Sequence, residues 1–260
     1  MRIINRIKKI AMTALAVLLA NGLMATPTRV TVRVKAKDAK FIGTGIGGAA
    51  VLIKNHLTAQ LLANGVTSGS SGDTKLILQS PLIRGQRITD EKTASYEAIV
   101  DINEPTLVDI EVTAPLSRKA AAIKGSLQVW LIPGKDILGE GIVIDLPGLI
   151  LDVLSPTSHQ AITLSSLNQG LLEFKISLTM LCGCAISKGG VWNSDEFEVK
   201  ATLKKDGIEK GAYNLKKLPE NNLFAGALNI TAKGSYELLV YAFNPKDGNA
   251  GVDKINFVIQ

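Results

Sequence analysis

Thr28-Arg-Val-Thr-Val-Arg-Val-Lys-Ala-Lys37 is the stretch of the chain that decides the fold class. Val30, Val32, Val34 and Ala36 alternate in it with polar or charged residues. A period of two places every second side chain on the same face of a β-strand. The alternation therefore predicts a strand with one apolar, buried face and one charged, solvated face.

Similar segments continue to the C-terminus, each bounded by Gly, Pro, Asn or Asp. The composition is rich in Val, Ile, Thr and Gly, and aromatic residues make up 5% of it, which suits stacked sheets rather than helical bundles. Apolar density falls between Ser155 and Gly170. We therefore predict an all-β protein of two consecutive β-sandwich domains, 26–160 and 168–260. The expected strands are 49–54, 61–62, 75–79, 96–102, 106–113, 126–132 and 142–146, then 171–181, 196–203, 212–218, 223–230, 235–243 and 253–259, with one short helix at 117–124.

The first 25 residues have the three parts of a bacterial secretory signal. Residues 1–9 are basic, residues 10–20 are apolar and uncharged, and Ala25 closes the segment with a small side chain. We expect cleavage after Ala25 and a mature protein in the periplasm or at the cell surface. A retained anchor is the alternative, although the apolar run is about half of the roughly 20 residues that a spanning helix needs. No later apolar run reaches that length unbroken, so we expect no membrane span after cleavage.

The signal also accounts for most of the positive charge. Its removal takes away four of the 29 basic residues and none of the 23 acidic ones, so the formal net charge falls from +6 to +2. A charge this small gives no electrostatic basis for binding nucleic acid. We therefore expect no nucleic-acid partner.

Two segments are similar to known families. Gly48-Ala-Ala-Val-Leu-Ile-Lys-Asn55, followed by 61–72 with its glycine-rich turn, resembles the carboxypeptidase-regulatory, or transthyretin-like, β-sandwich. The aromatic residue usual after that turn is replaced by Asp73-Thr74. The resemblance implies a seven-stranded module that helps folding, assembly or binding and has no activity of its own. Gly234-Ser-Tyr-Glu-Leu-Leu-Val-Tyr-Ala242 resembles the last hairpin of immunoglobulin-like domains, which implies that Tyr236 forms the structural tyrosine corner.

Both cysteines lie in Leu178-Thr-Met-Leu-Cys-Gly-Cys-Ala-Ile186. If the strand continues through this segment, Met180, Cys182 and Cys184 share one face, and three sulfur ligands favour Cu(I). An exported pair of cysteines also predicts a disulfide, which here requires Gly183 to bend the chain. Buried or partner-linked thiols are the third alternative.

No catalytic residues are identified. The two histidines, His56 and His159, show no metal-ligand spacing and lie near no recognisable nucleophile. Scattered carboxylates are common in any β-rich chain of this length. We therefore predict that the chain is not an enzyme.

The most apolar later segment is 142–154, centred on Pro147-Gly148. We expect it to be a hairpin, either buried on both faces or forming an apolar interaction patch. The patch would consist of Ile142, Ile144, Leu149 and Leu151.

The residues together favour a non-catalytic binding or assembly protein of the cell envelope that uses no cofactor. Its partner would be another envelope or surface protein, or a second copy of the chain. The alternative hypothesis is a periplasmic copper-binding or thiol-redox protein that uses the Met-x-Cys-Gly-Cys segment.

Overall fold

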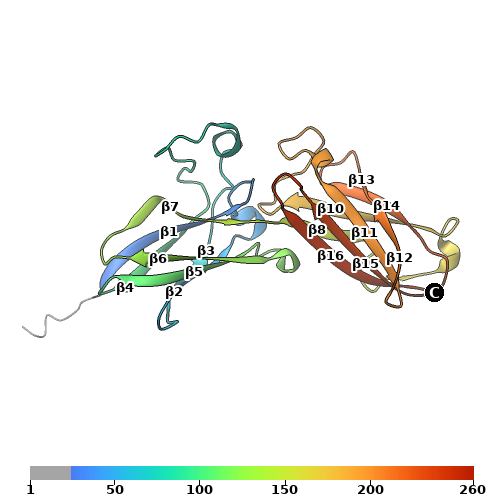
Figure 1. The fold of residues 1–260 in the computed structure, drawn as a ribbon, viewed down its shortest axis with the longest axis horizontal. Helices are drawn as coiled ribbons and strands as arrows, with labels where there is room; N and C mark the ends of the chain where they lie inside the picture. Colours follow the sequence, from blue (N-terminus) through green and yellow to red (C-terminus); the bar gives the residue numbers. More distant parts are fainter. Residues whose placement is uncertain (1–24) are drawn as a thin grey trace, which may run out of the picture.

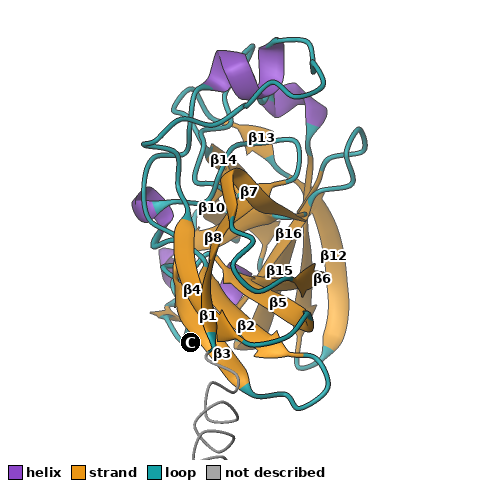
Figure 2. Ribbon diagram, turned by 90° about the vertical axis from the view of Figure 1, so that its left-hand side faces the viewer, coloured by secondary structure: helices purple, strands orange, loops and turns teal. Residues whose placement is uncertain are grey.

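The structure, a computed structural model, describes residues 25–260, in which two β-sandwiches lie end to end (Figure 1). The expected secretory signal falls almost entirely on residues 1–24 and so lies outside the described residues. Strands dominate both sandwiches, and the helical elements are short turns (Figure 2). The prediction of an all-β protein built from sandwiches is confirmed. No helix within residues 25–260 is long and apolar enough to cross a membrane.

The first sandwich has seven strands in two sheets. The order β4-β1-β7 forms one sheet and β3-β2-β5-β6 forms the other. β1 pairs antiparallel with β4 and parallel with β7. The strands are β1 (Thr26–Ala36), β2 (Ala50–Asn55), β3 (Leu61–Val66), β4 (Tyr96–Ile102), β5 (Thr106–Ala114), β6 (Ile123–Leu131) and β7 (Ile137–Leu146), with 3₁₀ turns η1 (Thr44–Ile46) and η3 (Lys119–Ala121).

The second sandwich has the strand order of an immunoglobulin-like domain. One sheet runs β13-β14-β10-β8 and the other β12-β11-β15-β16-β9, where β9 lies parallel to β16. The two sheets correspond to the DEBA and C′CFG sheets of the immunoglobulin fold. The strands are β8 (Leu149–Ser155), β9 (Ala161–Ile162), β10 (Leu171–Met180), β11 (Glu198–Lys205), β12 (Ile208–Asn214), β13 (Lys216–Lys217), β14 (Leu223–Asn229), β15 (Gly234–Phe243) and β16 (Ala250–Ile259), with 3₁₀ turns η4 (Leu164–Ser166) and η5 (Ser194–Glu196).

The hairpin expected at 142–154 does not exist. β7 pairs with β1 in the first sandwich, whereas β8 pairs antiparallel with β10 in the second. The chain therefore passes from one sandwich to the other at Pro147-Gly148, and not between Ser155 and Gly170 as the fall in apolar density suggested. The 155–170 segment lies within the second sandwich, where β9 pairs with β16. Both sandwiches contribute to one contiguous cluster of buried apolar side chains.

β1 is buried on both faces. Val30, Val32, Val34 and Ala36 lie in the core as predicted, but Thr31 and Arg33 on the opposite face are only 2% and 4% exposed. The expectation of a solvated charged face was wrong, because the segment between β3 and β4, residues 67–95, folds over that face. We call this segment the insertion.

The insertion contains a segment that was predicted to be a strand and is not one. Residues Lys75–Gln79 form a π-helical turn, η2, instead of a strand. The side chain of Asp73 accepts a hydrogen bond from the backbone N–H of Leu76 at 2.7 Å and so starts the turn. Ile77 from this turn packs with Phe41 and Ala94 in a small second core.

Candidate binding surface

The outer face of the four-stranded sheet carries an ordered set of polar side chains. In β5, Val108, Ile110 and Val112 point into the sandwich, so Asp109 and Glu111 point outward. Register places Lys54 of β2 and Gln128 of β6 on either side of Asp109. Alternation along three adjacent strands therefore brings these outward side chains together.

These side chains are held by mutual contacts. Lys54 Nζ lies 2.8 Å from Glu111 Oε2 in an ion pair. His56 Nδ1 lies 2.9 Å from Asp109 Oδ2, and the side-chain amide of Gln128 lies beside this pair. The hydrogen bond with His56 holds the pKa of Asp109 below its usual value. The contact with His56 thus favours the charged form of the Asp109 carboxylate.

The His56–Asp109 pair resembles part of a catalytic triad but has no nucleophile. Within residues 25–260, the hydrogen-bond partners of the His56 side chain are Asp109 and Gln128 and include no Ser, Thr or Cys. Catalysis of acyl transfer requires a nucleophile within hydrogen-bond reach of the histidine. The pair offers hydrogen-bonding groups to a polar ligand.

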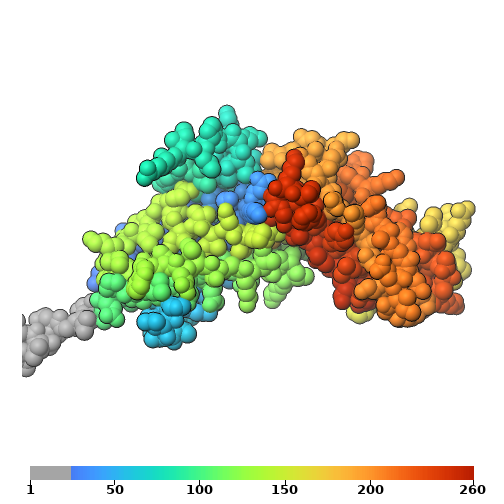
Figure 3. All heavy atoms as spheres, in the orientation of Figure 1, coloured from blue at the N-terminus to red at the C-terminus, as the bar shows by residue number. Residues whose placement is uncertain are grey.

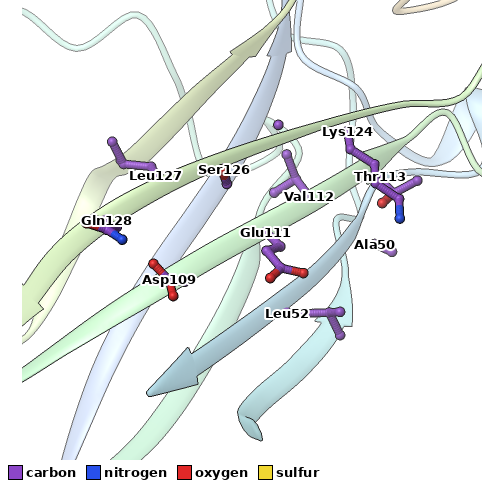
Figure 4. Close-up of a pocket in the computed structure, with 11 residues that line it drawn as sticks. Ala50, Leu52, Asp109, Glu111, Val112, Thr113, Lys124, Ser126, Leu127 and Gln128 are labelled. Atoms are coloured by element: carbon purple, nitrogen blue, oxygen red, sulfur yellow. The ribbon is translucent and has the colours of Figure 1, made fainter. Parts of the chain in front are cut away.

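A shallow groove of about 810 Å³ runs beside this row along β5 and β6 (Figure 4). Small side chains leave the space open at Ala50 and Ser126, while Leu52 supplies an apolar wall. Glu111 and Lys124 stand at its margin with opposite charges. The groove can therefore accept either apolar or charged side chains.

β6 ends the sheet beside this groove and has a free edge. It carries one charge, at Lys124, and none from Gly125 to Leu131. Leu127 and Trp130 are 42% and 59% exposed. The edge strands β4 and β12 carry the charges that usually prevent strand addition, Glu97 and Asp101 in β4 and Glu209 and Lys210 in β12, whereas β3, at the opposite edge of the same sheet, carries none. The outward row consists of Lys54, His56, Asp109, Glu111 and Gln128. We call this row, the groove and the strand β6 together the β5–β6 face.

Sequence reasoning missed this surface. It found neither metal-ligand spacing nor a nucleophile at His56, and it gave Trp130 no role. The available signal was the outward position of Asp109 in a strand with alternating apolar residues. The partner of that carboxylate could not be inferred, because His56 and Asp109 meet only through the pairing of β2 with β5.

The predicted sulfur site lies at the junction between the sandwiches. β10 ends at Met180, and the chain turns at Gly183, where φ is +77°. Cys182 and Cys184 are joined as a disulfide across this turn, with their Cα atoms 5.4 Å apart. The strand does not continue through the segment, so the shared face required for three sulfur ligands is not formed. The turn instead abuts the first sandwich: a Cβ at Gly183 would lie 3.5 Å from Ile46 Cδ1.

Polar contacts fix the same junction. Asn249, fully buried in the β15–β16 loop, accepts a hydrogen bond from Gly148 N–H at 2.7 Å through Oδ1. Its Nδ2 donates to the carbonyl of Lys37 at 3.0 Å and to Asp247 Oδ2 at 2.9 Å. Trp192 Nε1 donates to the Asp38 carbonyl at 2.8 Å. The Asn249 side chain thus connects the linker, the first sandwich and its own loop.

The remaining predicted residues have structural positions. Tyr236 is 3% exposed at the start of β15, and its hydroxyl donates to the Ala232 carbonyl at 2.7 Å, the contact expected of a tyrosine corner. The proposed apolar interaction patch is wrong. All four of its side chains are at most 8% exposed, because β7 and β8 each pack into the core of their own sandwich. They are Ile142, Ile144, Leu149 and Leu151.

Comparisons with known proteins add little to the geometry. No family model matches the chain, and no curated protein matches it. An engineered protein aligns with 50% of the chain at 10% identity and a TM-score of 0.32, and the chain spans 24% of that protein. Fibronectin(III)-like modules of Clostridium thermocellum CbhA align at 11% identity over 90% of this chain and 94% of theirs, with a TM-score of 0.28. Drosophila N-cadherin EC1-4 aligns at 9% identity over 91% of this chain and 51% of its own, with a TM-score of 0.30. Because these scores are low, the fold assignment rests on the strand order described above.

Proposed function

We propose that the chain is a non-catalytic, exported binding protein that acts on another protein of the cell envelope, in the periplasm or at the cell surface. The observation that carries this proposal is the free, uncharged edge of β6 beside an open groove. A long apolar edge strand exposes unpaired backbone N–H and C=O groups and is a template for another strand. An extended segment of a partner can therefore add to β6.

The β5–β6 face provides both affinity and selectivity for such a segment. Backbone pairing along β6 would supply hydrogen bonds independent of the partner's sequence. Alternate side chains of the partner would fall into the groove beside Leu52 and meet the charged pair of Lys54 and Glu111. The closed junction supports this role because it presents the face on a fixed two-domain body.

The architecture of the first sandwich agrees with an accessory module. Its seven strands match the number that the carboxypeptidase-regulatory-like resemblance implies, which supports the proposal that it is a module of that type. The resemblance implies a module that helps assembly or binding without chemistry of its own. Within residues 25–260, no group of three or more His, Cys, Asp and Glu side chains is arranged to hold a metal ion.

Site-specific photo-cross-linking in intact cells tests the proposal. A photoreactive phenylalanine analogue at Trp130 is expected to capture a discrete envelope protein. Leu127→Lys, which adds a charge to the free edge, should abolish that product. The matched control is Ile99→Lys, because Ile99 is 63% exposed on the edge strand β4 of the other sheet. A product that survives Leu127→Lys, or disappears equally with Ile99→Lys, would refute strand addition at β6.

A further inference from the structure

The tip of the insertion is an exposed apolar turn that no function described above uses. All seven residues from Pro81 to Arg87 are exposed, and the side chains of Leu82 and Ile83 are 84% and 64% exposed. The N–H of Gln86 donates to the Ile83 carbonyl at 3.0 Å, which closes a tight turn. Figure 3 shows the insertion standing out from the body of the first sandwich. We propose that this tip inserts into the surface of an anionic phospholipid membrane.

The base of the insertion is anchored well enough to present the tip. Ile77 packs with Phe41 and Ala94 in the second core. Arg33, 4% exposed on β1, donates to the carbonyls of Thr93 and Ala94 at the end of the insertion and to Gly139. A buried arginine that satisfies three carbonyls fixes the segment to the sheet. The exposed tip is therefore not the loose end of an unpacked loop.

The charge around the tip identifies the class of surface. Residues 74–89 contain Lys75, Arg84 and Arg87 and no acidic residue. Arg87 lies 4.0 Å from Glu140 at the edge of ion-pair distance, whereas no ion pair within residues 25–260 is recorded for Arg84. Cations beside protruding apolar side chains are the combination that binds anionic lipid headgroups while aliphatic groups enter the acyl boundary.

The shape of the tip favours lipid over a folded partner. Leu82 and Ile83 project from a narrow turn, in which Gly85 has a φ of +79°. A protein partner would need a pocket that complements this projection, whereas a lipid surface accommodates it without complementary shape. The proposal is independent of the β5–β6 face, because the insertion packs on the β4-β1-β7 sheet and the binding edge belongs to the other sheet.

Vesicle sedimentation of the processed protein, isolated after export by its own signal, tests the proposal. The probes are vesicles of phosphatidylcholine alone and of equal parts phosphatidylcholine and phosphatidylglycerol. Binding is expected to the anionic vesicles and to weaken with salt. The double variant Leu82→Ser with Ile83→Ser should lose affinity about tenfold or more, and Arg84→Gln about fivefold. Leu57→Ser is the matched control, because Leu57 is 88% exposed on the turn between β2 and β3, and it should bind as the unaltered protein does.

Three results would overturn the inference. The first is equal sedimentation with both kinds of vesicle, or with neither. The second is unchanged affinity of the double tip variant, or a loss shared by Leu57→Ser. The third is a tip variant that keeps its vesicle affinity but loses a cross-linked envelope protein, which would make the tip a protein-docking site. Leu127→Lys should leave vesicle binding unaltered, so failure of the β5–β6 proposal and failure of this one remain distinguishable.

Discussion

Replacing Asn249 by alanine tests whether one buried amide holds the two sandwiches together. The side chain makes three hydrogen bonds: it accepts from Gly148 N–H at 2.7 Å and donates to Lys37 O at 3.0 Å and Asp247 Oδ2 at 2.9 Å. The variant leaves the buried Gly148 N–H without a partner, which costs about 1–3 kcal/mol, and the other two bonds contribute about 0.5–1.5 kcal/mol each. We therefore expect Asn249→Ala to lower the free energy of unfolding by about 3 kcal/mol.

Equilibrium unfolding in urea measures this loss. Tryptophan fluorescence is a direct probe, because Trp192 bonds the Asp38 carbonyl across the same junction. The matched control is Asn55→Ala, whose side chain accepts two backbone N–H bonds, from Leu57 at 2.9 Å and Thr58 at 3.0 Å, in an exposed turn of one sandwich. Because water can replace those bonds, that variant should lose about 1 kcal/mol or less. An Asn249→Ala variant no less stable than Asn55→Ala would refute the assignment of Asn249 as the polar centre of the junction.

Three further predictions follow from single side chains. Arg33→Met should lower the free energy of unfolding by about 3 kcal/mol, because three carbonyl groups lose their donor. It should also increase hydrogen exchange in residues 67–95. A loss of stability below about 1 kcal/mol would contradict the anchoring role of Arg33. The pKa of Asp38 is raised above 3.8, first by desolvation and then by Asp247, so the stability from its protonation is present below pH 3.8 and is lost as the pH rises through the raised value. Asp38→Asn should therefore raise Tm at about pH 7 and have no effect at about pH 3. Asp206→Asn is the control: it removes a carboxyl group whose pKa is lowered by Lys205, so it should lower Tm at neutral pH. Both positions have a positive φ, which Asn tolerates. Tyr236→Phe should lose about 1 kcal/mol in thermal unfolding, since the ring keeps its stack on Phe257 and only the hydrogen bond to Ala232 is removed; an unchanged Tm would argue against a tyrosine corner.

Two errors in the sequence-based prediction arise from contacts that the residue pattern does not show. Residues 75–79 contain three consecutive aliphatic residues and so fit a strand or a turn of helix equally well. The helical turn is favoured over a strand by the Asp73 side chain, which starts the turn, and by the packing of Ile77 in the small core around Phe41. Similarly, the alternation in β1 correctly gave the buried valines, but the burial of Arg33 depends on a segment 60 residues later in the chain.

The candidate site was the least predictable part. Each strand's alternation indicates which side chains point outward, but the row of His56, Asp109 and Gln128 exists only because β2, β5 and β6 are neighbours. The disulfide was among the alternatives open from spacing alone. Its place against Ile46, at the junction, required the positions of both sandwiches.

The sequence by itself determined the fold class, most of the strands and, for most strands, the apolar face that is buried. These features depend on local chemistry: a side-chain period of two, and Gly, Pro, Asn and Asp at turns. The tertiary structure alone decided which strands pair, and with that the place where one sandwich ends and the next begins. Pro147-Gly148 looks like the turn of a hairpin, but β7 finds its hydrogen bonds on β1 and β8 finds its own on β10. Backbone groups of a strand can pair with any edge of suitable length, so the choice between partners belongs to the packing of the whole chain.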